Sequence, residues 1–375
     1  MRRTSGRFRR VPQVRDEQRQ DQDRALADYV LALDLGGSLA KIARIDATGG
    51  LSAIDRVPTP SSADSDSLVR WLADQIASRG HDPAHGRCLG WGVVVPGIIR
   101  ADTGHVVAAP NLGWYDVPVQ TRLGELTGLD GVVAHDVRSG GLAEATLGAG
   151  RGVANLLFLP LGTGIAGAMF VDGRLLDADG YAGEIGHIRV RAAGELACAC
   201  RQVGCLETVA SAAGVARSYQ RLKEFSREAD GLVEPNTPTA EQEPHRLNAT
   251  SDAEHPVARS SPTDAFDARQ VATRARAGDV EARAAFALAA DALAEALVLY
   301  LTLLAPEVVV IGGGLSAAAD LFVPQMERSI AATVSFQRRP RLVTALLGPD
   351  AGVIGAGLQG WDHVRQQSRA EGSRA

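Results

Sequence analysis

The sequence has little cysteine, four residues in 375, and it has no apolar run long enough to cross a membrane. A membrane-spanning helix needs about 18 or more consecutive apolar residues. The longest candidate, 284–305, carries Asp291 and Glu295, so we predict a buried amphipathic helix there. Four cysteines cannot form an extended disulfide framework, which favours a reducing compartment, and we expect a cytoplasmic protein. The net charge of −5 gives no general reason to expect nucleic acid as a partner.

Two segments are poor in apolar residues. The first, 1–28, is rich in Arg, Gln and Asp and lacks the apolar core of a secretion signal. We interpret it as a disordered basic tail, with a nucleic-acid-binding tail as the alternative. The second, 226–263, is interpreted as a mobile insertion because its prolines stand among Glu, Ser, Thr and Asn. These prolines are Pro235, Pro238, Pro244, Pro256 and Pro262.

A cluster of cysteines is the most informative feature that is present. Three of the four cysteines fall within eight residues, and a histidine precedes them. One His and three Cys supply the ligands of a closed, structural zinc site. The candidate ligands are His187, Cys198, Cys200 and Cys205. Two carboxylates flank the cluster, Glu184 and Glu207, and neither is needed for the metal. They indicate that the zinc site holds carboxylates in place for a polar substrate.

Glycine turns of one kind occur twice. An apolar strand (29–34) runs into paired glycines and a second apolar strand (39–45), which predicts a β-hairpin. The same pattern recurs from 155 to 171, so we expect two structurally similar halves. The turn residues are Gly36, Gly37 and Ser38 in the first hairpin and Gly162, Thr163 and Gly164 in the second. Such turns let phosphate oxygens approach backbone N–H groups, although a structural hairpin without a ligand is the alternative.

The second turn also matches the dinucleotide fingerprint G-x-G-x-x-G. That motif requires a helix directly after the glycines. A short β run, 168–171, follows instead, and we reject a Rossmann fold on this ground. A third cluster, Gly312, Gly313 and Gly314, follows an apolar strand and precedes a helical pattern. It resembles a floor for a flat base, but alone it indicates only a strand-to-helix turn.

In this order, the motifs resemble those of the ROK family of sugar kinases and repressors, within the actin-like ATPase superfamily. The resemblance covers 29 to about 359, except the insertion. The matching motifs begin at Asp34, Val95, Pro110, His135, Gly162, Gly183, Cys198 and Gly312. Each is weak alone, but the ordered set with the His/Cys signature is specific.

The resemblance implies an α/β protein with the two-lobed actin-like ATPase (ribonuclease H-like) fold, an inter-lobe cleft and a structural zinc site. The expected lobes are 29–134 and 135–347, the second with the zinc motif at 187–205. The segment from about 348 to 363 is a candidate to pack back on the first lobe. Members of this family usually form homodimers or homotetramers, so the resemblance implies one of these assemblies.

The resemblance also implies roles for individual residues. Asp136 would take the proton from a sugar hydroxyl, and Asp34 would hold Mg²⁺ through water. The implied substrate ligands are Asn111, His135, Glu184, His187 and Glu207. The implied ATP-binding residues are Asp34, Gly36, Gly37, Ser38, Gly162, Thr163, Gly164, Gly312, Gly313 and Gly314. Purely structural roles remain as alternatives: Asp136 could only cap the helix that follows, Glu184 could be a solvated loop acid, and Asn111 could be a turn residue.

Three positions depart from the family pattern. His135 stands where an Asn usually precedes the catalytic Asp, Arg138 replaces another frequent Asn, and Arg201 replaces a Gly after the second cysteine. His135 puts the substrate preference in question, because neutral imidazole is bulkier than an amide. Arg201 requires its turn to tolerate a side chain or to change its backbone angles.

These observations predict an ATP-dependent hexose kinase that uses small-molecule sugar and ATP, with glucose to glucose 6-phosphate as the leading reaction. Alternative substrates are N-acetylmannosamine, N-acetylglucosamine, fructose and allose. The alternative of another class is a sugar-responsive transcriptional regulator. Regulators of this family carry a DNA-binding domain of about 60 residues before the first phosphate turn. Only 28 residues precede Tyr29, so we expect the kinase.

Overall fold

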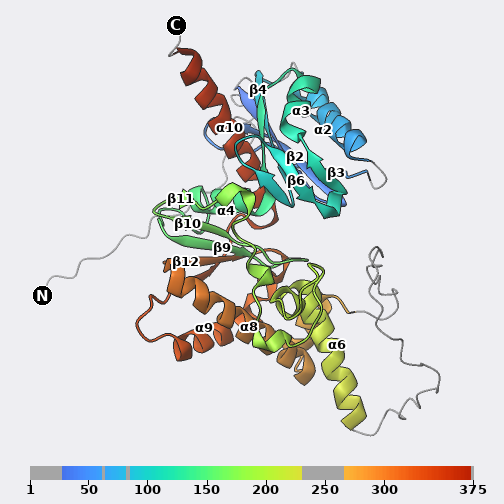
Figure 1. Ribbon diagram of the computed structural model, residues 1–375, viewed down its shortest axis with the longest axis vertical. Helices are drawn as coiled ribbons and strands as arrows, with labels where there is room; N and C mark the ends of the chain where they lie inside the picture. Colours follow the sequence, from blue (N-terminus) through green and yellow to red (C-terminus); the bar gives the residue numbers. More distant parts are fainter. Residues whose placement is uncertain (1–27, 61–63, 82–84, 230–265, 373–375) are drawn as a thin grey trace, which may run out of the picture. The chain divides into compact units, whose positions relative to one another are not determined.

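The computed structural model describes residues 28–60, 64–81, 85–229 and 266–372 (Figure 1). Residues 1–27 of the predicted tail (1–28) and residues 230–263 of the predicted insertion (226–263) lie outside the described residues. The described start of that insertion, 226–229, is helical, because it ends helix α6 (Ala212–Ala229). The chain divides into two compact units, unit 1 (Met1–Ala134 and Ala356–Ala375) and unit 2 (His135–Gly355).

A mixed five-stranded sheet forms the centre of unit 1, in the order β3-β2-β1-β4-β8. Its strands are β1 (Tyr29–Leu35), β2 (Leu39–Asp46), β3 (Asp55–Pro58), β4 (Cys88–Val95) and β8 (Gly131–His135). Strands β1 and β2 pair antiparallel, and β4 lies parallel to β1 on its other side. The predicted first hairpin is therefore confirmed. A small antiparallel sheet follows β4 and contains β5 (Ile98–Arg100), β6 (His105–Ala109) and β7 (Trp114–Val117).

Helices cover both faces of the unit 1 sheet. Helices α2 (Ser65–Gly80) and α3 (Val119–Thr127) lie on one side, where their apolar residues join the core of β1 and β4 (Figure 1). Helix α10 (Ala351–Gly372) lies on the other side. It packs closely, since a β-carbon on Gly92 would collide with the carbonyl oxygen of Ala356. The indole of Trp361 donates a hydrogen bond of 2.8 Å to the carbonyl of Ile45 in β2.

Unit 2 repeats this sheet plan, in the order β11-β10-β9-β12-β13. Its strands are β9 (Leu156–Pro160), β10 (Ala168–Val171), β11 (Arg174–Leu175), β12 (Val308–Gly312) and β13 (Arg341–Thr344). Strands β9, β10 and β11 pair antiparallel, and β12 lies parallel to β9. The second predicted hairpin is confirmed, and with it the expectation of two similar halves. The predicted turn between β10 and β11 contains Asp172 and Gly173, both at positive φ.

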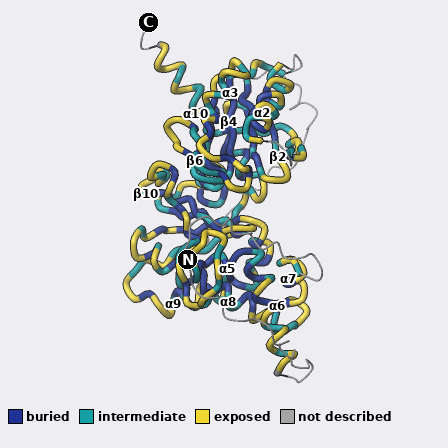
Figure 2. The backbone as a smooth tube through the Cα atoms, turned by 45° about the vertical axis from the view of Figure 1, so that its right-hand side comes forward, coloured by how far each residue is buried: buried dark blue, intermediate teal, exposed yellow. Residues whose placement is uncertain are grey.

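Successive apolar residues of the unit 2 strands point to opposite faces of the sheet. Leu157 and Leu159 of β9 join the core formed with α8 (Val280–Leu304) and α9 (Ala319–Thr333). Leu156 and Phe158 point to the opposite face, which α4 (Asp136–Thr146) covers (Figure 1). A sheet buried on both faces requires continuous apolar strands rather than alternating ones. The central strands β1, β4, β9 and β12 are accordingly mostly buried, whereas the edge strands β3 and β13 are not; Figure 2 shows the buried parts of the chain in dark blue.

Helix α8 is the one helix in the described part of the chain that is long and apolar enough to span a membrane. Its mean hydropathy is 1.8, and 44% of the apolar window is buried. It packs against α6, α7 (Ala268–Arg276) and α9 in unit 2. The expected buried helix is thus observed, and it starts four residues earlier than 284, at Val280, after the N-cap Asp279.

A buried carboxylate ties together two loops of unit 2. The side chain of Glu144 is fully buried and accepts hydrogen bonds from the backbone N–H groups of Ala149 (2.8 Å), Leu346 (3.1 Å) and Leu347 (2.7 Å).

We expect Glu144→Gln to lower the free energy of unfolding by about 2–3 kcal/mol, because an amide N–H₂ group would face backbone donors. Urea denaturation measures this. The exposed Glu327→Gln is the control, and equal stability of both variants would contradict the assignment.

Candidate functional site

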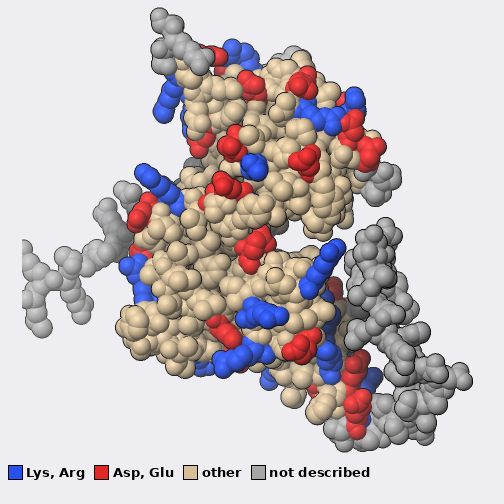
Figure 3. Space-filling view, in the orientation of Figure 1, with Lys and Arg blue, Asp and Glu red and all other residues tan. Residues whose placement is uncertain are grey.

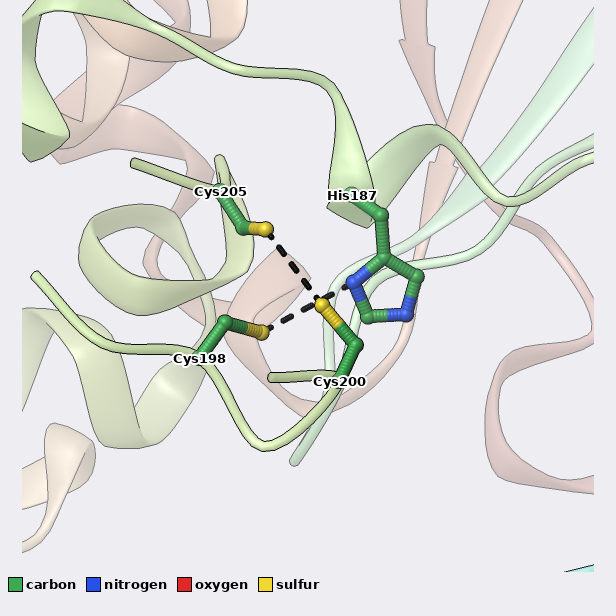
Figure 4. Close-up of side chains that lie close together, drawn as sticks. All are labelled: His187, Cys198, Cys200 and Cys205. Carbon is green, nitrogen blue, oxygen red and sulfur yellow. Dashed lines mark hydrogen bonds between the residues drawn. The ribbon is translucent and has the colours of Figure 1, made fainter. Parts of the chain in front are cut away.

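The predicted zinc ligands come together in unit 2. His187 ends the short helix η3 (Ile185–His187), and the cysteines follow on a loop that folds back beneath it (Figure 4). The Nδ1 atom of His187 lies 3.7 Å from Sγ of Cys198, and Sγ of Cys200 lies 3.6 Å from Sγ of Cys205. All four candidate ligand atoms lie within 4.8 Å of one another. None of the three cysteines is in a disulfide.

The donor set fits a zinc ion. Zn–S bonds of about 2.3 Å in a tetrahedron place neighbouring donors about 3.8 Å apart, close to the observed spacings. Burial, followed by hydrogen bonds from the neighbouring thiols, raises the pKa of Cys205 to about 12. A cluster of thiolates therefore needs a bound cation to compensate their charge. At the departure Arg201, φ is 71°, so this residue carries its side chain in the left-handed conformation that glycine adopts more readily.

The two flanking carboxylates occupy different environments. Glu207 begins α5 (Glu207–Ala210), and its Oε2 accepts a hydrogen bond of 2.9 Å from the backbone N–H of Ile165. Glu207 therefore supports the second glycine turn, and a β-carbon on Gly164 would lie only 2.7 Å from this oxygen. Glu184 is exposed, and its Oε2 lies 3.8 Å from Nε2 of His187. Each carboxylate lies next to a candidate zinc ligand in the chain, Glu184 three residues before His187 and Glu207 two residues after Cys205.

The second and third glycine turns are joined directly. The N–H of Leu161 donates to the carbonyl of Gly312 (2.9 Å), and the N–H of Leu315 donates to the carbonyl of Leu161 (3.0 Å). Gly313 has φ of 75°, and a β-carbon there would collide with the backbone of Leu161. Only glycine fits this close approach. The helical pattern after the turn begins as η5 (Gly314–Ala318) and continues as α9.

A cavity of about 630 Å³ opens beside these two turns within unit 2. Gly162, Thr163 and Gly314 line it on one side. Helix α7 forms another wall through side chains that the sequence analysis did not single out: Asp267, Arg269, Thr273 and Arg276. Arg276 ties the walls together, because it donates to Asp320 and to the carbonyl of Ala317. The capping box of Asp267 and Gln270 was the available sequence signal for this helix.

The first glycine turn lies in unit 1, between β1 and β2. Gly37 and Ser38 are exposed, and Thr59 fixes the turn by donating to the carbonyl of Gly36 at 2.8 Å. The carboxylate of Asp34 accepts from Nζ of Lys41 at 3.1 Å, across the hairpin. Asn111, in η1 (Pro110–Leu112), is exposed beside this turn; its carbonyl oxygen lies 3.6 Å from a β-carbon built on Gly37.

Every other predicted site residue belongs to unit 2. Asp136 is the first residue of α4, and its Oδ1 accepts from the N–H of Val137 at 2.7 Å. The carboxylate therefore lies at the positive end of a helix. His135 is the N-cap, and its Nδ1 accepts from the N–H groups of Val137 (3.1 Å) and Arg138 (3.4 Å). The cap of α4 is therefore His135, and the contact of Asp136 with the N–H of Val137 does not conflict with a second role for its carboxylate.

The environment of His135 keeps its ring neutral. Burial, with a smaller contribution from the Arg138 guanidinium, lowers the pKa of His135 to about 3. Because Nδ1 accepts hydrogen bonds from α4, the proton is on Nε2, which is left as a donor. An Asn in this position would divide the same tasks between Oδ1 and Nδ2. His135 therefore provides the same helix cap as Asn would, and its Nε2 remains as one N–H donor.

This burial makes stability depend on pH. The unfolded chain binds a proton at His135 below about pH 6.5, whereas the folded chain does not until about pH 3. The free energy of unfolding should therefore fall as the pH drops from 6.5, with a slope of about 1.4 kcal/mol per pH unit from this group. We expect His135→Asn, which retains the cap, to remove this slope. Denaturation between pH 4 and 7 measures it, with the exposed His81→Asn as control; an unchanged slope would contradict the assignment.

The visible surface shows no large field of one charge. In Figure 3, acidic and basic side chains are interspersed over the face that is drawn. This distribution agrees with the small net charge of −5.

The comparisons with known proteins agree on the family. The model of the ROK family matches residues 30–359. A glucokinase of Halalkalibacterium halodurans is 33% identical over 92% of this chain and 97% of its own length. Among solved structures, a ROK hexokinase from Thermus thermophilus has a TM-score of 0.68 at 26% identity, covering 90% of this chain and 99% of that one. A ROK glucokinase from Streptomyces griseus, solved with glucose and AMPPNP, has a TM-score of 0.68 at 24% identity, covering 89% and 99%.

Matched relatives carry other names as well. A xylose repressor of Caldicellulosiruptor bescii is 30% identical over 48% of this chain and 46% of its own length. An N-acetylmannosamine kinase of Citrobacter koseri is 31% identical over 51% of this chain and 64% of its own length.

Both units contain a five-stranded sheet of the same order, with a glycine turn in its hairpin. This is the ROK kinase fold, which is one form of the actin-like ATPase fold. The chain belongs to the ROK family.

Proposed function

We propose that this protein is an ATP-dependent hexose kinase that converts glucose to glucose 6-phosphate. The observation that carries the proposal is the arrangement within unit 2. A carboxylate, Asp136, stands at the start of α4, and Glu184 and Glu207 flank the His/Cys cluster that contains His187. The family and the relatives named glucokinase support the same reaction.

In the proposed reaction, the sugar hydroxyl oxygen attacks the γ-phosphorus of ATP. Asp136 accepts the hydroxyl proton as the oxygen–phosphorus bond forms, and the bond from the γ-phosphorus to the bridging oxygen breaks to release ADP. Phosphoryl transfer needs alignment and charge neutralisation more than covalent chemistry. We assign alignment of the sugar to Asn111, His135, Glu184, His187 and Glu207.

We assign the nucleotide to the glycine turns. Within unit 2, the cavity beside Gly162, Thr163 and Gly314 has a volume suited to a nucleoside. We propose that Gly164, Gly312 and Gly313 complete this wall. In unit 1, Gly37 and Ser38 are exposed, and we assign their N–H groups to phosphate oxygens. The N–H of Gly36 donates to the carbonyl of Leu39 at 3.1 Å, so we assign Gly36 to the shape of the ATP-binding turn. Mg²⁺ would neutralise phosphate charge when bound, and we assign Asp34 to its hydration shell.

Zinc has a structural role in this proposal. The donor set of His187 and the three cysteines leaves no open position at a tetrahedral ion. His187 would bind zinc through Nδ1, the atom that faces the cysteines, and a sugar hydroxyl through Nε2.

The identity of the sugar is the finer part of the proposal. A coupled assay of ADP release should show kcat/KM highest for glucose in a panel that includes N-acetylmannosamine, N-acetylglucosamine, fructose and allose. Mass spectrometry of the product identifies the phosphorylated sugar, and reactions without sugar or without ATP are the controls. A clear preference for an N-acetyl sugar would replace glucose. An absence of sugar-dependent turnover, together with sequence-specific DNA binding, would replace the kinase by a regulator.

A further inference from the structure

Arg138 is a buried cation on the first turn of α4, two residues after Asp136. Only 5% of its surface is exposed. Its Nη1 donates to the carbonyl of Gly180 at 3.0 Å and to that of Ala182 at 3.5 Å, and its Nε lies 3.2 Å from Oδ1 of Asp177. A buried guanidinium is tolerated when its charge and its donors are paired in this way. One side chain of α4 therefore makes three contacts with a single turn, 177–182.

That turn adopts a backbone that its residues do not favour. Ala178 and Asp179 have φ of 50° and 54°, in the left-handed region, where residues with a β-carbon are disfavoured. Asp177 supports the turn from within, since its Oδ2 accepts from the N–H of Gly180 at 3.1 Å. External contacts must hold such a conformation. Arg138 supplies them, because a long side chain with several donors reaches two carbonyls and one carboxylate together.

The turn leads directly into the segment that carries Glu184. Directly before Glu184, the N–H of Gly167 donates to the carbonyl of Gly183 at 2.7 Å, and after Glu184 the N–H of Gly186 donates to the carbonyl of Ile165 at 3.1 Å. Three residues after Glu184, His187 belongs to the His/Cys cluster. Contacts before and after Glu184 thus fix the segment on which it is exposed. Among them, the contacts of Arg138 come from α4, the helix that also carries Asp136.

We infer that Arg138 is a positioning residue that fixes the Glu184 segment relative to Asp136 by clamping the 177–182 turn onto α4. The inference rests on the proposed function, in which Glu184 binds the sugar and Asp136 accepts its proton. The contacts of Arg138 distinguish this chain from a ROK protein with the frequent Asn at that position, since the shorter amide has fewer donors and no charge.

The experiment compares Arg138→Met, Arg138→Lys and Asp177→Asn with the exposed Arg174→Met as matched control. Steady-state kinetics should show the sugar KM of Arg138→Met raised about tenfold or more, because a misplaced ligand weakens sugar alignment. The KM for ATP should change less than twofold, since the glycine turns lie on other segments. Arg138→Lys keeps the charge and should recover part of the loss. Hydrogen exchange gives a readout without activity: amides of 177–187 should exchange about tenfold faster in Arg138→Met, and those of β9, 156–160, should not.

The outcomes separate this inference from the proposed function. A sugar KM within twofold of the wild type, or unchanged exchange at 177–187, overturns the role of Arg138. If the wild type phosphorylates no sugar, the proposed function fails, and with it the role of Arg138 in sugar alignment; faster exchange would then retain the clamp alone. If Arg138→Met does not unfold cooperatively, Asp177→Asn takes its place, because it removes one charge and keeps the shape of the side chain.

Discussion

Replacing Asp136 with asparagine should lower kcat by about 10²- to 10⁴-fold, the range that a general base contributes. The amide keeps the size of the carboxylate but cannot accept the hydroxyl proton. The sugar KM should change little, because the amide oxygen can still accept a hydrogen bond from the substrate. Stability should also change little, because Asn is well tolerated at a helix start. Steady-state kinetics and thermal unfolding measure these quantities.

The matched control for this substitution is Asp172→Asn. Asp172 lies in the turn between β10 and β11 with φ of 50°, a conformation that Asn adopts readily. It should retain wild-type kcat. A kcat for Asp136→Asn within threefold of the wild type would assign proton transfer to another group and leave Asp136 only its contact with the first turn of α4.

Replacing Cys205 with serine should have the largest effect on the zinc segment. Cys205 is fully buried, and its removal leaves three donors where a closed site needs four. We expect loss of bound zinc and a fall in kcat/KM of about ten- to a hundredfold, the range that loss of groups supporting a metal ligand costs at other sites. The physical reason is that Glu184 and Glu207 flank the segment that the ion would hold. Elemental analysis gives the zinc content per chain, and sugar kinetics give the second effect.

The control for Cys205 is Cys88, which lies alone in unit 1 at the start of β4. Cys88→Ser should retain one zinc per chain. If Cys205→Ser also retained one zinc per chain with wild-type sugar kinetics, the cluster would not be the structural metal site proposed here.

The contrast between the cysteine cluster and the nucleotide cavity shows how far the sequence could be interpreted. His187 and the three cysteines are near one another in the chain, and only one kind of site combines these residue types at such spacing. The walls of the cavity come instead from α7, the β9–β10 turn and the turn after β12. No local pattern connects these segments, because their register depends on long-range bonds such as Leu161 to Gly312.

The same distinction applies to single residues beside the site. Arg138 could be recognised in the sequence as a departure, but not as the clamp of a turn about forty residues away. The family resemblance implies His135 as a sugar ligand, and a neutral imidazole has one donor and one acceptor nitrogen. The helix α4 takes the acceptor, because the N–H groups of its first turn have no partner within the helix.

The sequence by itself determined both glycine-turned hairpins, the His/Cys cluster and the family resemblance, because each depends on residues close together in the chain. Only the tertiary structure decided which partners the side chains use: Glu207 with the second glycine turn, Arg138 with the 177–182 turn, and α7 with the cavity. The physical reason is that hydrogen bonds and close packing between distant segments depend on the sheet order. Neither kind of contact produces a periodic pattern of residues in the sequence.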